Sequence, residues 1–152
     1  MTHPSEPDYR PIVSGSTNGI ADDGVHDLAG KNIADRLEAS GKMWRVSAEN
    51  APPNCFPGVV DLNPEDGAGL CLRKRNPAIS FTDISGAAAR RAHIADFSRF
   101  DLTAAKYALI IPNLCQDRRD CSVAVSDKFL IREFKSQPSP VFNLGRVEWQ
   151  CK

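Results

Sequence analysis

Ser5 is the residue whose type and surroundings best suit a nucleophile. It lies between Pro4 and Pro7, where a loop is expected to turn into a helix, because serine is a preferred N-cap and proline is tolerated in a first turn. A hydroxyl group at a helix N-terminus faces unpaired backbone N–H groups and the positive end of the helix dipole, which favour a phosphate. The pattern therefore indicates either a serine that attacks phosphorus or a serine that only caps the helix.

Few other reactive side chains occur at a spacing that indicates a site. The chain has five cysteines but no Cys-x-x-Cys pair, and its three histidines are scattered, which argues against a zinc site. Asp22 and Asp23 could be metal ligands, but adjacent acids in a loop more often cap a helix or face solvent. Arg90 and Arg91 belong to an alanine-rich stretch and are expected on its solvent face rather than at a phosphate.

Four stretches, in order along the chain, carry a resemblance to a known family. The first two are His-Pro-Ser-Glu-Pro-Asp-Tyr at 3–9 and Gly-Ser-Thr-Asn-Gly-Ile-Ala-Asp-Asp at 15–23. The third is Arg-Lys-Arg-Asn-Pro at 73–77, and the fourth runs from Tyr107 to Asp127 through Ile-Pro-Asn-Leu-Cys and Asp-Cys-Ser-Val. Together they resemble the phosphoesterase family of bacterial and fungal acid phosphatases and phospholipases C.

The resemblance implies a partial alkaline-phosphatase-like α/β fold, with a mostly parallel sheet flanked by helices, and hydrolysis of a phosphate ester substrate assisted by a divalent metal cation. It places Ser5 at the nucleophile position, where serine forms a covalent intermediate that water then releases. His3, two residues earlier, either lies near the site as a second catalytic residue or is a surface histidine. The positions that the resemblance assigns to substrate and phosphate binding are Asp8, Arg75, Arg119 and Asp120.

Three of these positions depart from the family pattern. Asp8 stands where the family has asparagine, and its carboxylate would repel a phosphate dianion unless a cation lay beside it. Arg75 and Arg119 stand where the family has histidines. Arginine stays protonated, so it cannot act as a metal ligand or general acid, but it can hold a phosphate through paired hydrogen bonds. The two arginines either are anion clamps or mark an inactive copy.

The resemblance makes residues 1–147 the central part of a larger catalytic domain and 148–152 a divergent tail. The family's Glu-Asn pair before His-Pro-Ser and its later Asp-Glu motif have no counterpart, so the metal ligands are unknown. We therefore expect a truncated phosphoesterase domain; the alternative is an inactive remnant that at most binds phosphate or a protein partner. Lost strands would expose sheet edges through which another chain could associate.

The resemblance also pairs Cys115 with Cys121, and Cys55 with Cys71 could form a second bridge across a long loop, leaving Cys151 as the odd thiol. Such bridges suit a secreted protein, and reduced thiols are the alternative. Localisation stays open, because members of the family are often secreted or periplasmic, whereas this sequence carries no signal-peptide pattern.

Composition excludes several classes of protein. The chain has 152 residues, of which 41% are hydrophobic and 25% charged, and its 19 basic side chains balance 19 acidic ones. These values fit one globular domain. The lack of basic excess argues against a nucleic-acid partner, and the sequence has no apolar run long enough for a transmembrane segment.

The order of apolar segments predicts alternating helices and strands, as in a parallel α/β sheet. Expected helices cover 9–13, 27–39, 84–97 and 127–134, and expected strands cover 43–47, 78–81 and 107–111. Pro11 lies inside the first helix, where a proline costs about 3 kcal/mol, so either this helix is short and kinked or its local geometry differs from that of the family. Gly41 is expected to cap the second helix and Ser126 the last. The run 107–111, apolar throughout, indicates an inner strand covered on both faces.

Overall fold

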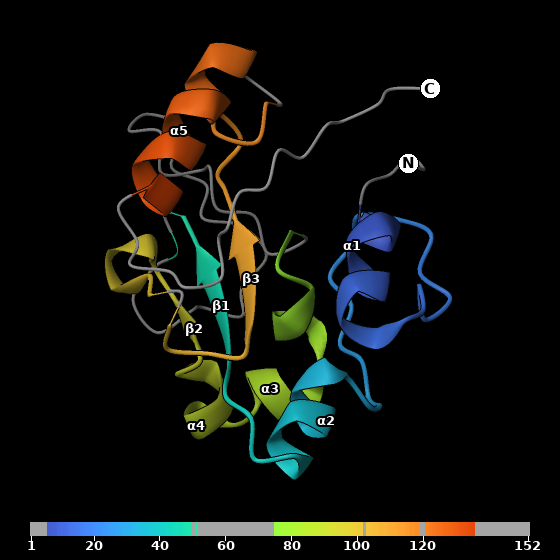
Figure 1. Cartoon of the computed structure of the whole chain (residues 1–152). Helices are drawn as coiled ribbons and strands as arrows, with labels where there is room; N and C mark the ends of the chain where they lie inside the picture. Colours follow the sequence, from blue (N-terminus) through green and yellow to red (C-terminus); the bar gives the residue numbers. More distant parts are fainter. Residues whose placement is uncertain (1–5, 50, 52–74, 102, 119–120, 136–152) are drawn as a thin grey trace.

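The structure, a computed structural model, describes residues 6–49, 51, 75–101, 103–118 and 121–135. The described part contains a parallel sheet formed by β1 (Trp44–Ala48), β2 (Ile94–Ala95) and β3 (Tyr107–Ile111), in the order β2-β1-β3 (Figure 1). Because helices surround this parallel sheet, the predicted α/β fold is confirmed.

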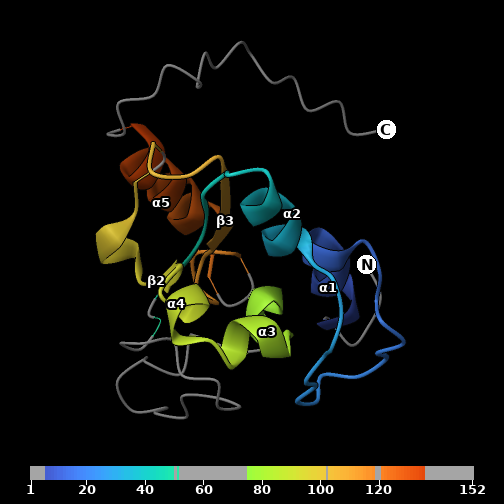
Figure 2. The same ribbon diagram turned by 90° about the horizontal axis from the view of Figure 1, so that it is seen from below.

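Helices connect and cover the strands. In chain order they are α1 (Glu6–Ser14), α2 (Ile33–Ala39), the 3-10 helix η3 (Pro77–Ser80), α3 (Thr82–Ser85), α4 (Ala88–Arg91), the 3-10 helix η4 (Phe97–Arg99) and α5 (Val123–Lys135). Helix α1 lies on the β3 side of the sheet, and α5 lies beyond the carboxyl ends of the strands (Figure 1, Figure 2). None of the helices in the described ranges is long and apolar enough to cross a membrane.

The main core lies between the sheet and the helices α1, α2, α3 and η3. Trp44 and Val46, which alternate along β1, belong to it, and the partly buried Leu109 of β3 packs against it. Its other buried members are Val13, Ala34, Ala78, Ile79, Phe81, Ile84 and Ile94. Burying a large apolar side chain contributes about 2 kcal/mol, so this cluster is a major source of stability and fixes α1 against η3.

A second cluster of aromatic side chains joins α5 to η4. The ring of Phe97 meets the fully buried Phe129 edge-on, with 5.4 Å between ring centroids, and Phe100 meets Phe134 at 5.7 Å. Edge-to-face pairs of this kind add to the stabilisation from burial. The cluster therefore holds α5, whose first turn belongs to the fourth matched stretch, against the segment after β2.

Helix α1 runs over nine residues with Pro11 inside it, and it extends beyond the expected range 9–13 at both ends. The prediction for the end of α2 is confirmed. Gly41 follows α2 in the left-handed conformation, with φ of 64°, and its N–H donates to the Glu38 carbonyl at 2.9 Å. The Lys42 N–H donates to the Leu37 carbonyl at 2.8 Å. These bonds end α2 and turn the chain directly into β1.

The expected strand over 78–81 is wrong, because η3 occupies these residues. The segment still pairs with Leu28, whose N–H donates to the Ser80 carbonyl at 2.8 Å and whose carbonyl accepts from the Thr82 N–H at 2.9 Å. An isolated parallel bridge thus stands where a strand was expected. A short apolar run indicates burial, but its length is too small to fix the backbone conformation.

The expected helices over 27–39 and 84–97 are too long. Asn32 caps the N-terminus of α2, so the residues before it lie outside the helix. The second stretch breaks at Gly86, where α3 ends, and again where the buried Ile94 enters the sheet as β2. Tertiary packing of Ile94 overrides the helical character of the alanine-rich sequence.

Two further expectations are wrong. Helix α5 begins at Val123, so Ser126 lies inside it and does not cap it. In the described sheet β3 is an edge strand whose residues are all only partly buried, and the central position belongs to β1. The run 107–111 is therefore a strand, as predicted, but within the described sheet it is not an inner one. An apolar run does not reveal the order of strands in a sheet.

Arg90 does not lie on a solvent face, as the sequence suggested, but at the centre of a network of ion pairs. Its Nη2 lies 2.9 Å from Asp35 Oδ1 and 2.5 Å from Glu38 Oε2, and its Nη1 pairs with Asp83. Glu38 also accepts a hydrogen bond from Trp44 Nε1 at 2.8 Å. The network therefore connects α2, α3 and α4 to the central strand.

Arg90→Ala is expected to lower the free energy of unfolding by about 1–2 kcal/mol at neutral pH. Burial raises the pKa of Asp35 and of Glu38, but hydrogen bonds from Arg90 and other donors outweigh burial and lower both pKa values. A lowered carboxylate pKa stabilises the fold above the unfolded-state pKa, and this contribution is lost below about pH 4. The difference in the free energy of unfolding between wild type and Arg90→Ala should therefore become smaller in acid.

Urea unfolding at pH 7 and pH 3 measures this difference, and Arg36→Ala, which removes an exposed arginine from α2, is the matched control. A deficit for Arg90→Ala that is equally large at both pH values would contradict the assignment.

Candidate active site

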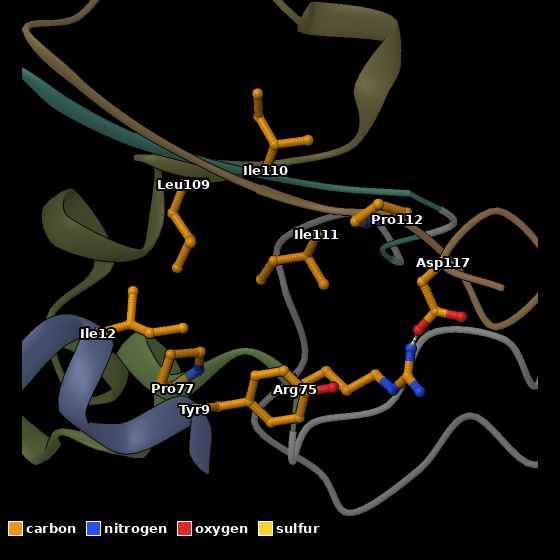
Figure 3. A pocket seen from close by; sticks show the side chains of 9 residues that line it. All are labelled: Tyr9, Ile12, Arg75, Pro77, Leu109, Ile110, Ile111, Pro112 and Asp117. Carbon is orange, nitrogen blue, oxygen red and sulfur yellow. Dashed lines mark ion pairs between the residues drawn. The ribbon is translucent and has the colours of Figure 1, made fainter. Parts of the chain in front are cut away.

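A pocket of about 130 Å³ lies between α1 and the carboxyl end of β3 (Figure 3). Its lining residues are Tyr9, Ile12, Arg75, Pro77, Leu109, Ile110, Ile111, Pro112 and Asp117. The side chains of Leu109 and Ile111 point from β3 toward α1, whereas that of Ile110 points to the opposite face of the strand (Figure 3). The pocket wall is mostly apolar, and its charged groups, Arg75 and Asp117, lie together at one end.

The pocket brings together the first, third and fourth matched stretches. Helix α1 begins within the first stretch, at Glu6, and packs against η3, which begins immediately after Arg75 and Asn76. The fourth stretch contributes β3 and the loop that follows it. In open α/β sheets, ligands bind outside the carboxyl ends of the strands, where such loops begin. Sequence reasoning did not identify the apolar lining of this pocket, because those residues also read as ordinary core positions.

Arg75 and Asp117 form an ion pair between the third and fourth stretches (Figure 3). The side chain of Arg75 is 5% exposed and that of Asp117 is 20% exposed. A charge removed from water to this degree is retained only beside a partner, so the pair holds the segment before η3 against the loop after β3. The guanidinium has five donors, and any phosphate bound by Arg75 would share them with Asp117.

Asn113 shapes the loop that carries Asp117. Its side-chain oxygen accepts from the backbone N–H groups of Cys115 at 3.0 Å and Gln116 at 2.9 Å, and its own N–H donates to Glu49 Oε2 at 3.0 Å. Glu49 follows β1, so this bond connects the carboxyl ends of neighbouring strands, and burial raises the pKa of the Glu49 carboxyl. Sequence reasoning did not name Glu49, although its position shortly after the strand expected over 43–47, at the edge where sites form, could have indicated it.

The second matched stretch contacts the first at the N-terminus of α1. Asp23 Oδ1 accepts a hydrogen bond from the Glu6 backbone N–H at 2.9 Å. The Glu6 carboxylate in turn pairs with Arg10, and the side chains of Glu6 and Arg10 are 2% and 0% exposed. The expectation that Asp22 and Asp23 lie in solvent or cap a helix is confirmed, although Asp23 caps α1 rather than the helix that follows it.

The structure places only some of the predicted site residues. Those outside the described residues are His3, Ser5, Cys55, Cys71, Arg119 and Asp120. Asp8 is half-buried in the first turn of α1, where the helix dipole favours a carboxylate. The catalytic and phosphate-binding roles of these residues stay predictions.

Cys115 and Cys121 are joined by a disulfide, with their Cα atoms 4.7 Å apart. Of the two states that the sequence left open for this pair, the structure has the oxidised one. The bond closes the turn that follows Asn113 and connects it to the segment that leads into α5.

The described residues do not fit the divalent metal that the resemblance implies. Within the described ranges, no group of three or more histidine, cysteine or carboxylate side chains is arranged to hold a metal ion. The carboxylate of the pocket, Asp117, is engaged by Arg75.

The chain is similar to fungal acid phosphatases over most of its length. It is 33% identical over 136 residues to a probable acid phosphatase of Kluyveromyces lactis. The aligned region covers 85% of this chain and 32% of that protein. The chain is 34% identical over 135 residues to an acid phosphatase of Aspergillus niger, with 83% and 32% covered. The similarity to these relatives supports the assignment of this chain to a phosphatase family.

A phosphate-repressible acid phosphatase of Penicillium chrysogenum is 27% identical over 148 residues, with 90% of this chain and 35% of that protein covered. The chain thus spans about a third of the length of the curated relatives it matches. No family model and no solved structure matches the chain, and the alkaline-phosphatase-like architecture stays a prediction.

Arg75→Met is expected to lower the free energy of unfolding by about 2–3 kcal/mol, because it leaves the Asp117 carboxylate near the pocket without its guanidinium. A double-mutant cycle with Asp117→Asn, measured by urea unfolding, should give a coupling energy above about 1 kcal/mol. Arg118→Met, which changes an exposed arginine of the same loop, is the control. Additive effects of the two substitutions would rule out the ion pair as a stabilising contact.

Reduction of the Cys115–Cys121 bond is expected to lower the free energy of unfolding by about 2 kcal/mol, the loop-closure term for so short a loop. Denaturant unfolding with and without a thiol reductant measures the change. The double variant Cys115→Ala with Cys121→Ala should unfold like the reduced protein and should not respond to reductant at this bond. Equal stability of the oxidised protein and the double variant would contradict a stabilising role.

Proposed function

We propose that the protein hydrolyses phosphate esters, with Ser5 as the nucleophile. The observation that carries this proposal is the meeting of the matched stretches: α1, the loop ending at Asp23, the Arg75 segment and the loop after β3 come together at one end of the sheet. Their similarity to acid phosphatases supplies the reaction class.

In this proposal the Ser5 oxygen attacks phosphorus, the bond to the alcohol leaving group breaks, and water then releases phosphate from the serine. Ser5 directly precedes Glu6, the first residue of α1, so its place in the chain is next to the positive end of that helix. The apolar wall formed by Tyr9, Ile12 and Leu109 offers contact to the organic part of the ester.

The divalent cation that the resemblance implies remains a prediction, as do phospholipase C-like activity and the phosphate contacts of Asp8, Arg75, Arg119 and Asp120. The alternative of an inactive remnant gains no support from the similarity to the acid phosphatases. Turnover measured with different divalent cations and with two classes of ester tests both predictions.

Purified protein should hydrolyse an aryl phosphate, and Ser5→Ala should lower kcat about a thousandfold or more, because it removes the attacking atom. Ser40→Ala is the control, since the Ser40 hydroxyl at the end of α2 donates to the Arg36 carbonyl. Turnover is measured across pH, after chelation, after return of magnesium, calcium, manganese or zinc, and with phosphatidylcholine vesicles as a second substrate.

Folded wild-type protein that turns over neither ester with any of these metals would overturn the proposed function. Equal turnover by wild type and Ser5→Ala would contradict the role of Ser5 as the nucleophile, but it would still support hydrolysis of phosphate esters.

A further inference from the structure

We propose that Asp23 is a positioning residue for Ser5, which it holds through the backbone N–H of Glu6. The proposal rests on the proposed function, in which Ser5 attacks phosphorus. Asp23 Oδ1 accepts from the Glu6 N–H at 2.9 Å. That N–H belongs to the peptide group that joins Ser5 to Glu6, so the carboxylate of Asp23 restrains the residue directly after the nucleophile.

The loop that ends at Asp23 is ordered by its own hydrogen bonds. The side-chain amide of Asn18 donates to Ser14 Oγ and to the Ser16 carbonyl, both at 3.0 Å. Ile20, only 8% exposed, anchors the middle of the loop, and its N–H donates to the Thr17 carbonyl at 3.1 Å. These contacts return the chain from the C-terminus of α1 to its N-terminus, where Asp23 reaches Glu6.

Helix α1 provides the fixed base that such positioning requires. The Glu6 side chain pairs with Arg10 one turn further along, both side chains are almost fully buried, and Val13 is held in the core. The carboxylate of Asp23 and the buried ion pair thus act on the backbone and the side chain of the same residue, Glu6. A helix N-terminus whose first N–H group has an acceptor is defined in position, and displacing a nucleophile by about 1 Å can cost about a hundredfold in rate.

The neighbouring acid, Asp22, provides a matched control. Its Oδ1 accepts from the Gly24 N–H at 2.8 Å and lies 2.6 Å from His26 Nε2, so these contacts stay within its own loop. Asp22→Ala removes the same charge as Asp23→Ala, one residue away, without removing the acceptor of the Glu6 N–H. Any effect of net charge alone should appear in both variants.

The experiment compares aryl phosphate hydrolysis by wild type, Asp23→Ala, Asp23→Asn and Asp22→Ala, at a temperature where circular dichroism shows each variant folded. Asp23→Ala should lower kcat about 10- to 100-fold with KM within about twofold, because the nucleophile and not ground-state binding is disturbed. Asp23→Asn keeps an acceptor oxygen and should stay within about threefold of wild type. Asp22→Ala should match wild type, and the Glu6 amide of wild type should be protected from hydrogen exchange.

Active wild type with an unchanged kcat in Asp23→Ala would overturn the positioning role and leave the proposed function standing. Equal loss in Asp23→Ala and Asp23→Asn would also overturn it, since the acceptor is present in the second. Unprotected exchange of the Glu6 amide in folded wild type would overturn it even if Asp23→Ala did not fold. Inactive wild type would instead mark the failure of the proposed function, and the positioning role with it.

Discussion

The side chain of Arg75 is almost completely withdrawn from water, and a guanidinium cannot be deprotonated to escape the cost of burial. It therefore needs a carboxylate, and Asp117 supplies one from a distant segment of the chain. This requirement fixes where the loop after β3 must lie relative to η3. The pocket exists because that loop and α1 are both held against the short segment that begins at Arg75.

Two kinds of interaction, apolar packing and hydrogen bonds, hold this end of the molecule together. Apolar packing of Val13, Ile79 and Trp44 sets the positions of whole elements, but it is non-directional and tolerates small shifts. Hydrogen bonds from Asn113 to Glu49 and from Glu6 to Asp23 are directional, and they lie at the ends of β1, β3 and α1. Precise placement of reacting groups is expected from the hydrogen bonds, because their distances and angles are narrowly defined.

Much of the fold could be predicted from local sequence, and the exceptions have a common cause. The strand at 107–111, the helix containing Pro11 and the turn at Gly41 follow from periodicity and from backbone rules that act over a few residues. The strand expected at 78–81 is wrong because a short apolar run indicates burial without fixing the backbone, and the hydrogen bonds of this segment go to Leu28, far away in sequence. Arg90 likewise looked like a surface residue, since its acidic partners lie on other helices.

The same distinction applies to the candidate site. Motif resemblance identified the stretches that build it, and Arg75 was named from the sequence. The sequence did not reveal that Asp117 pairs with Arg75 or that Asp23 caps α1, because both contacts join segments that approach each other only in the folded chain. The identity of a reactive residue is a local property, whereas its neutralisation and orientation are tertiary ones.

The most direct test of this account is a titration of the protein with orthovanadate, an analogue of the phosphoryl-transfer transition state, followed by backbone amide chemical shifts. Such analogues bind far more tightly than substrates to a site complementary to the transition state. The account predicts saturable shifts that concentrate on Tyr9, Arg75 and Asp117, which line one pocket and belong to three matched stretches. Saturable shifts that concentrate elsewhere, or none at all in folded protein, would contradict it.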